Sequence, residues 1–176
     1  TLALSGFVNA EDGASTSGRQ IEEVVVTAER QESSVQDTSI SITAFTEGMM
    51  EDFGIRNQSD LQNLIPATVI LPYDAAIRGV GRNFRSLGGD PGISTYMNGV
   101  YSEDLYTATI GSFWDIKRIE ILRGPQGTLY GRNAIGGAMN FIYNEPTQEL
   151  EGAFKVIGGT FDTVDTYGMV SGGIID

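Results

Sequence analysis

The sequence predicts an α+β domain that consists of a small mixed sheet and short helices. This domain is followed by the first antiparallel strands of a second, separate β structure. Between residues 38 and 146, short β-prone segments are interrupted by two short amphipathic helices. Glycine is concentrated from Gly79 to Gly137, in the connections between these strands. After Pro146 the pattern changes to two longer segments in which polar and apolar residues alternate. These three observations define the predicted class.

The composition sets limits on the function. The chain has 176 residues, 40% of them hydrophobic and 19% charged, which indicates one folded domain with extensions. No apolar stretch approaches the roughly 20 residues of a membrane-spanning helix. The sequence has no Cys and no His, which excludes thiol and imidazole catalysis, disulfides and zinc sites built from those ligands. The net charge of -12 argues against a nucleic-acid surface.

The first 37 residues are predicted to lie outside the domain. Residues 1–10 are mostly apolar and end in V-N-A, which is typical of the tail of a secretory signal peptide cleaved after Ala10. Residues 11–37 have the composition of a flexible segment, but Val24 to Ala28 form a β-prone island within it. This island is either an edge strand of the following domain or a peptide that adds to the sheet of a partner.

The domain itself is predicted from short periodic segments. Residues 39–45 alternate as a half-buried strand, with Ile40, Ile42 and Ala44 on one face. Two amphipathic helices follow. The first has an apolar face formed by Met49, Met50 and Phe53. The second begins at a Ser59 cap, ends at Pro66 and has an apolar face formed by Leu61, Leu64 and Ile65. Further strands are predicted at 68–71, 75–79, 93–97, 100–102, 116–122 and 138–143, with a tight hairpin at Asn98 and Gly99. Because glycine-rich loops bury little apolar surface, we expect either that these loops bind another molecule or that the domain sits inside a larger structure.

The segments after residue 146 have the length and alternation of transmembrane barrel strands. In residues 152–159, Phe154 and Val156 alternate with Ala153 and Lys155, and residues 163–174 show a similar alternation after a Gly-Gly-Thr turn. About ten alternating residues per strand is typical of the first hairpin of a transmembrane β-barrel. An ordinary soluble hairpin is the alternative.

No motif in the sequence requires catalysis or a bound cofactor. The segment RGVGRNF lacks the third glycine of a dinucleotide-binding turn, and no phosphate-binding loop or GxSxG nucleophile motif occurs. Glu103 and Asp104 are adjacent in a loop, where solvation explains them as well as a bound cation does. We therefore expect no enzyme activity, no cofactor and no metal site.

Residues 115–146, DIKRIEILRGPQGTLYGRNAIGGAMNFIYNEP, resemble the plug domain of TonB-dependent outer-membrane receptors. The family motifs I-E-V-L-R-G-P and Y-G-x-x-A-x-G-G correspond to Ile119 to Pro125 and Tyr130 to Gly137, and an apolar strand then runs to Pro146. Upstream, EEVVVTAER is similar to the TonB box, LQNLIP to the helix before the plug strands, AIRGVG to the arginine turn and TYMNGVY to a plug hairpin. The resemblance covers residues 22–146 in order.

The resemblance implies roles for three groups of residues. The TonB box, captured as an added strand by the periplasmic domain of TonB, would be Glu23, Val24, Val25, Val26, Thr27 and Ala28. Arg78 and Arg123, with Glu120 as a further member, would hold the plug to the wall of the surrounding barrel. Ligand contacts on the outer face would involve Tyr73, Asp74, Tyr101, Asp104 and Tyr106.

The implied protein is an outer-membrane receptor for the active uptake of a scarce ligand such as an iron siderophore, with the plug and TonB box facing the periplasm. The expected organisation is a signal-peptide remnant at 1–10, the flexible segment with the box at 11–37, the plug at 38–146 and the start of the barrel at 147–176. A full barrel needs several hundred residues, so we expect the chain to be a fragment or a truncated product. The alternatives are a soluble periplasmic binding module that uses the plug alone and an enzyme.

Overall fold

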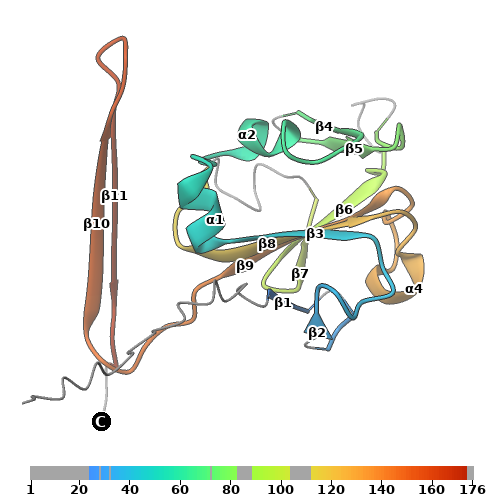
Figure 1. The fold of residues 1–176 in the computed structure, drawn as a ribbon, viewed down its shortest axis with the longest axis horizontal. Helices are drawn as coiled ribbons and strands as arrows, with labels where there is room; N and C mark the ends of the chain where they lie inside the picture. Colours follow the sequence, from blue (N-terminus) through green and yellow to red (C-terminus); the bar gives the residue numbers. More distant parts are fainter. Residues whose placement is uncertain are drawn as a thin grey trace, which may run out of the picture.

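A mixed five-stranded sheet forms the centre of the domain in the computed structural model, which describes residues 24–27, 29–31, 33–71, 73–82, 89–103 and 112–173 (Figure 1). The strand order is β3-β8-β9-β6-β7. These strands are β3 (Ile42–Thr46), β6 (Ile93–Met97), β7 (Val100–Ser102), β8 (Ile116–Arg123) and β9 (Gly137–Tyr143). β6 and β9 run parallel and the other pairs are antiparallel, which confirms the predicted mixed sheet.

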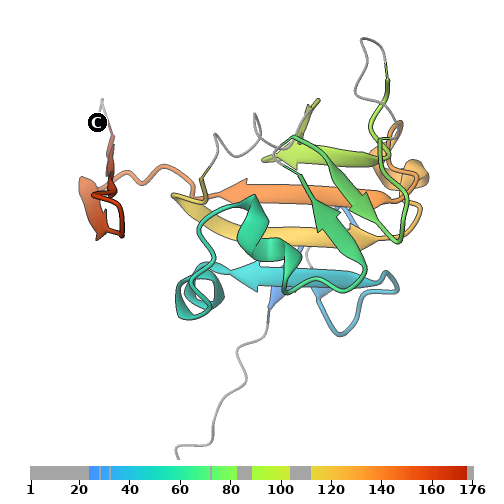
Figure 2. The ribbon, with the colours of Figure 1, turned by 90° about the horizontal axis from the view of Figure 1, so that it is seen from above.

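One face of the sheet is covered by the two predicted helices and a small two-stranded sheet (Figures 1 and 2). These elements are α1 (Glu47–Asp52), α2 (Gln58–Gln62), β4 (Thr68–Ile70) and β5 (Ala75–Ile77). Their apolar side chains form a continuous core with alternate residues of the sheet, among them Ile119, Ile121, Met139 and Phe141.

The helices confirm the predicted elements and correct some of their details. Met50, Leu61 and Ile65 are buried as expected, but Phe53 and Leu64, which follow the ends of the two helices, are 60% and 38% exposed. The cap of α2 is Asn57, whose side chain accepts from Ser59 N and Asp60 N, and not Ser59 as predicted. Asp60 completes a capping box with Asn57, and this pair explains why the helix begins two residues earlier.

The opposite face is covered by the predicted β-prone island and by a short helix (Figure 1). The elements here are β1 (Val25–Val26), β2 (Ser33–Ser34) and α4 (Gly127–Tyr130). β1 and β2 pair antiparallel and pack against a second cluster that includes Val26, Leu122 and Tyr130. The island therefore pairs with a strand of its own domain, β2, whether or not it also adds to the sheet of a partner.

The glycines beside β9 pack closely, which corrects the expectation that glycine-rich loops bury little. Gly137 has φ +154, and a Cβ there would lie 2.2 Å from the carbonyl oxygen of Leu122. A Cβ on Gly136 would lie 2.6 Å from Cδ1 of Ile93 and 2.8 Å from Cβ of Val80. Glycine is thus required where the β8–β9 connection meets the turn after β5.

The last two strands, β10 (Glu151–Gly158) and β11 (Val164–Ser171), form a hairpin beside the domain (Figures 1 and 2). The register places Phe154 opposite Gly168 and Val156 opposite Thr166, so one face carries no charged residue. The other face carries the charges, because Lys155 lies opposite Tyr167 and Ile157 opposite Asp165. In the part of the chain that is described, no helix is long and apolar enough to cross a membrane.

Candidate functional site

The candidate site is the place where residues 24–27 and 29–30, called the box segment below, lie on the sheet. Val26 is fully buried in the second cluster, whereas Val25 is 44% exposed. The alternation follows from the extended backbone, which points successive side chains to opposite sides. Val35 N donates to the carbonyl oxygen of Val24 at 3.0 Å, which continues the pairing of β1 with β2.

A buried carboxylate holds the end of β1. Glu120 is 0% exposed, and its Oε1 accepts from the main-chain N–H of Thr27 at 2.7 Å. The Thr27 hydroxyl lies 3.2 Å and 3.4 Å from the two carboxylate oxygens and can donate to either. Charge-assisted bonds of this kind are roughly twice as strong as neutral ones. The contact therefore joins the box segment to the centre of the sheet.

Two neighbours satisfy the rest of the carboxylate. Arg118 Nε donates to Glu120 Oε1 at 2.8 Å, and its Nη2 donates to the Thr27 hydroxyl at 3.1 Å. Asn140 Nδ2 lies 3.4 Å from Glu120 Oε2. Arg118 and Glu120 share one face of β8 because they are two residues apart, and Asn140 is opposite Glu120 on β9. The buried charge is paired, which is the condition for its stability inside the protein.

The far end of the box segment contacts α4. Arg30 Nη2 donates to the carbonyl oxygen of Leu129 at 3.2 Å, and its guanidinium lies 5.2 Å from the centre of the Tyr130 ring. Burial, followed by the charge of Glu120, raises the pKa of Tyr130 to about 12, so this phenol stays neutral. The Tyr96 hydroxyl donates to the carbonyl oxygen of Tyr130, and the two rings pack edge to face.

The two arginines that were expected to contact a barrel lie near each other, away from the box segment. A Cβ on Gly124, next to Arg123, would lie 3.8 Å from Nη1 of Arg78. Among the described residues, the buried Nε of Arg123 has no hydrogen-bond partner. Glu120 points to the opposite face of β8 and has its own partners, so it is separate from this pair. Contact of these three residues with a barrel stays a prediction.

The expected ligand-contact residues lie in different parts of the molecule. Tyr73 and Asp74 connect β4 to β5, and Asp74 Oδ1 is 3.2 Å from Nε of Arg82. Tyr101 packs on the face that carries the box segment and accepts a hydrogen bond from Asn133 Nδ2 at 2.9 Å. Asp104 and Tyr106, like Glu23 and Ala28 of the expected box, lie outside the described residues. The ligand contacts stay predictions.

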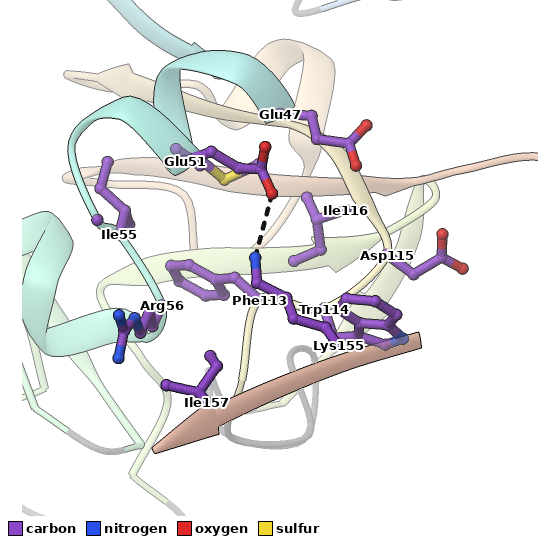
Figure 3. A pocket seen from close by; sticks show the side chains of 12 residues that line it. Glu47, Glu51, Ile55, Arg56, Phe113, Trp114, Asp115, Ile116, Lys155 and Ile157 are labelled. Carbon is purple, nitrogen blue, oxygen red and sulfur yellow. Dashed lines mark hydrogen bonds and ion pairs between the residues drawn. The ribbon is translucent and has the colours of Figure 1, made fainter. Parts of the chain in front are cut away.

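The hairpin touches the domain through its charged face (Figure 3). Lys155 Nζ is 3.1 Å from Glu51 Oε1 of α1, and the rings of Trp114 and Tyr167 stack with centres 5.3 Å apart. A cavity of about 280 Å³ lies between α1, the loop before β8 and β10. The uncharged face that includes Phe154 and Val156 points away from these contacts and is exposed.

Sequence reasoning missed Arg30, Arg118 and Asn140. The two-residue spacing of Arg118, Glu120 and Leu122 predicts that they share a face, but nothing in the sequence indicates that the box segment covers it. No group of three or more Cys, His, Asp or Glu in the described ranges is placed to hold a metal ion.

The described residues thus form a mixed-sheet domain with a docked N-terminal strand, followed by a hairpin with one charged and one uncharged face. The model of the TonB-dependent receptor plug domain matches residues 34–138. The chain belongs to this family. The resemblance seen in the sequence and the predicted fold class are thereby confirmed.

Named relatives agree with this assignment. The chain is 32% identical to the pesticin receptor of Yersinia pestis, over 94% of this chain and 25% of that protein. It is 30% identical to the ferripyoverdine receptor of Pseudomonas aeruginosa, over 95% of this chain and 20% of that protein. Both relatives are named as receptors. The chain spans about a quarter of their length or less.

Solved structures show the same arrangement. The ferripyoverdine receptor of Pseudomonas aeruginosa bound to ferripyoverdine superposes with a TM-score of 0.66 at 26% identity, covering 85% of this chain and 20% of that one. The ferric yersiniabactin uptake receptor of Yersinia pestis gives a TM-score of 0.64 at 28% identity, covering 78% of this chain and 22% of that one.

Proposed function

We propose that this chain provides the plug, the coupling box and the first barrel hairpin of an outer-membrane receptor that imports an iron chelate with energy delivered by TonB. The observation that carries the proposal is the box segment, whose strand β1 (Val25–Val26) is held on the plug by few contacts. Such a strand can leave the plug and add to the sheet of a partner, where main-chain bonds provide the affinity. The ligand class follows from the named relatives, which bind ferric pyoverdine and ferric yersiniabactin.

The hairpin supports a membrane location over a soluble binding module. Phe154, Val156 and Val170 are 76%, 55% and 80% exposed and share one uncharged face of the hairpin. A lipid-facing strand needs such a face, whereas on a soluble protein it is an aggregation hazard. The opposite face contacts the plug, as the inner wall of a barrel does.

The box assignment is tested with Val25→Pro in the receptor as the cell makes it. Val25 is exposed and, because Val24 bonds to Val35, its own main-chain N–H points away from β2. Proline removes that donor without disturbing the β1–β2 bonds. We expect uptake of iron-55 from a ferric siderophore to be lost, while binding of the chelate to cells is retained. Val25→Ala keeps the donor and is the matched control.

Two results contradict the proposal. Uptake by Val25→Pro at the level of Val25→Ala shows that residues 24–27 are not the coupling strand. Cells that lack the protein but accumulate every ferric chelate tested as fast as the parent strain show that iron uptake is not its role. The panel should include hydroxamate, catecholate and phenolate chelates, because no described residue selects among them.

A further inference from the structure

One main-chain edge of the box segment pairs with β2, and the other edge is blocked at Thr27. Main-chain groups of an antiparallel strand point alternately to its two sides. Val24 bonds to Val35, so the groups of Val24 and Val26 face β2, whereas those of Val25 and Thr27 face the other edge. On that other edge the N–H of Thr27 is taken by Glu120, at 2.7 Å.

We propose that Glu120 is a clasp that takes up the Thr27 N–H on the edge of the box segment away from β2, so that docking on the plug and capture by an added strand exclude one another. The proposal rests on the function proposed above, and it assigns the regulation of the box to a residue of the plug interior. Asn140 is a positioning residue, because it acts on the box through the orientation of the carboxylate, whereas Arg118 both orients the carboxylate and donates directly to the Thr27 hydroxyl.

The balance of contacts suits a reversible clasp. A single side chain of the box, Val26, is fully buried, and the remaining contacts are the pairing with β2 and the hydrogen bonds of Thr27, Glu29 and Arg30. Glu120 keeps Arg118 and Asn140 as partners when Thr27 leaves. The buried carboxylate therefore remains paired after the box segment detaches. A cavity of about 500 Å³ that is lined by Thr27, Arg118 and Asn140 lies beside the contact.

The sequence makes a direct test convenient because it contains no cysteine. A thiol introduced by Val26→Cys is buried when the clasp is closed, and one introduced by Val25→Cys is exposed. Labelling of each variant with a maleimide, in cell envelopes that contain the protein, reports the open fraction without any partner. We expect Val26→Cys to react at least tenfold more slowly than Val25→Cys. Equal rates overturn the clasp.

Two further substitutions assign the effect to Glu120. Thr27→Val removes the hydroxyl from Glu120 and Arg118 but leaves the plug interior intact, and Glu120→Gln removes the charge at constant size. Each should raise the labelling rate of Val26→Cys by roughly tenfold, since bonds to charged groups are the strong ones. Thr27→Ser should restore slow labelling. Thr166→Val on the hairpin and Glu51→Gln on α1 are matched controls that should change nothing.

Competition is measured with the purified periplasmic domain of TonB. The Glu120→Gln receptor should bind it roughly tenfold more tightly than the parent, whereas Glu51→Gln should not change the affinity. Faster labelling with unchanged affinity overturns the exclusion. If the TonB domain binds no form of the receptor, the function proposed above is wrong, and the labelling rates alone then decide whether the clasp exists.

Discussion

The two faces of the central sheet are covered in different ways. On one face α1, α2 and the β4–β5 pair seal a large apolar core that includes Ile119 and Phe141. On the other face the box segment contributes one fully buried side chain and several polar contacts centred on Glu120. The elements on the first face are held by burial of apolar surface, which is lost only when the whole domain unfolds. The box segment on the second face is held by a few directional bonds, which can open locally.

In the function proposed above, this difference separates the stability of the domain from the release of its box segment. Apolar contacts over a wide area are lost only when the domain unfolds, so the first face can withstand removal of the box segment. The polar contacts at Glu120, in contrast, are lost when the box segment alone detaches from the sheet. A receptor that must release a strand and keep its plug folded needs both kinds of face.

The largest expected effect is a substitution that disrupts the packing on both faces of the sheet at once. Gly137→Ala places a Cβ 2.2 Å from the carbonyl oxygen of Leu122, at a φ of +154 that other residues rarely adopt. We expect no folded protein, because β8 and β9 cannot keep their register around such a contact. Circular dichroism and recovery from the membrane measure this. Gly48→Ala in α1, where nothing lies within 4 Å, is the control and should be tolerated.

The next effect is confined to the first face. Phe141→Ala empties a fully buried site in the core and should lower the free energy of unfolding by about 3 to 5 kcal/mol. Urea titration followed by tryptophan fluorescence measures it. Phe53→Ala, which removes a ring that is 60% exposed, should cost under about 1 kcal/mol. Equal losses for the two variants would mean that the apolar core does not carry the stability.

The matching change on the other face should act locally. Val26→Ala removes two buried methyl groups, worth about 1.5 kcal/mol, from the contact of the box segment with the sheet. We expect trypsin to cleave after Arg30 about tenfold faster, with an unchanged unfolding midpoint. Cleavage after the exposed Lys155 serves as the internal reference. A shift of the midpoint without faster cleavage would show that both faces unfold as one unit.

The elements that the sequence predicted well are those whose pattern is local. The hairpin at Asn98 and Gly99 forms as predicted, because both residues accept positive φ, at +48 and +79. The strand at β2 was missed, since Ser33 and Ser34 have no β propensity and pair only because β1 lies beside them. The short helix α4 was missed as well, since no side chain caps it.

The candidate site was predicted in part. The β-prone island was recognised, and the resemblance gave Glu120 a place in the motif Ile119 to Pro125. The partner of Glu120 could not be predicted, because Thr27 lies 93 residues earlier and reaches it through a connection without periodicity. Strand alternation separates Glu120 from Arg123, and this separation could have been read from the sequence alone.

The smallest expected effect concerns the hairpin, which is attached to the first face by exposed contacts. The side chains of Lys155 and Glu51 are 43% and 65% exposed, so their ion pair is solvated and weak. Lys155→Met should change the free energy of unfolding by less than about 0.5 kcal/mol and leave the slow labelling of Val26→Cys unchanged. A loss above about 2 kcal/mol would show that the hairpin helps to seal the first face, and the contrast between the two faces would then extend to the barrel wall.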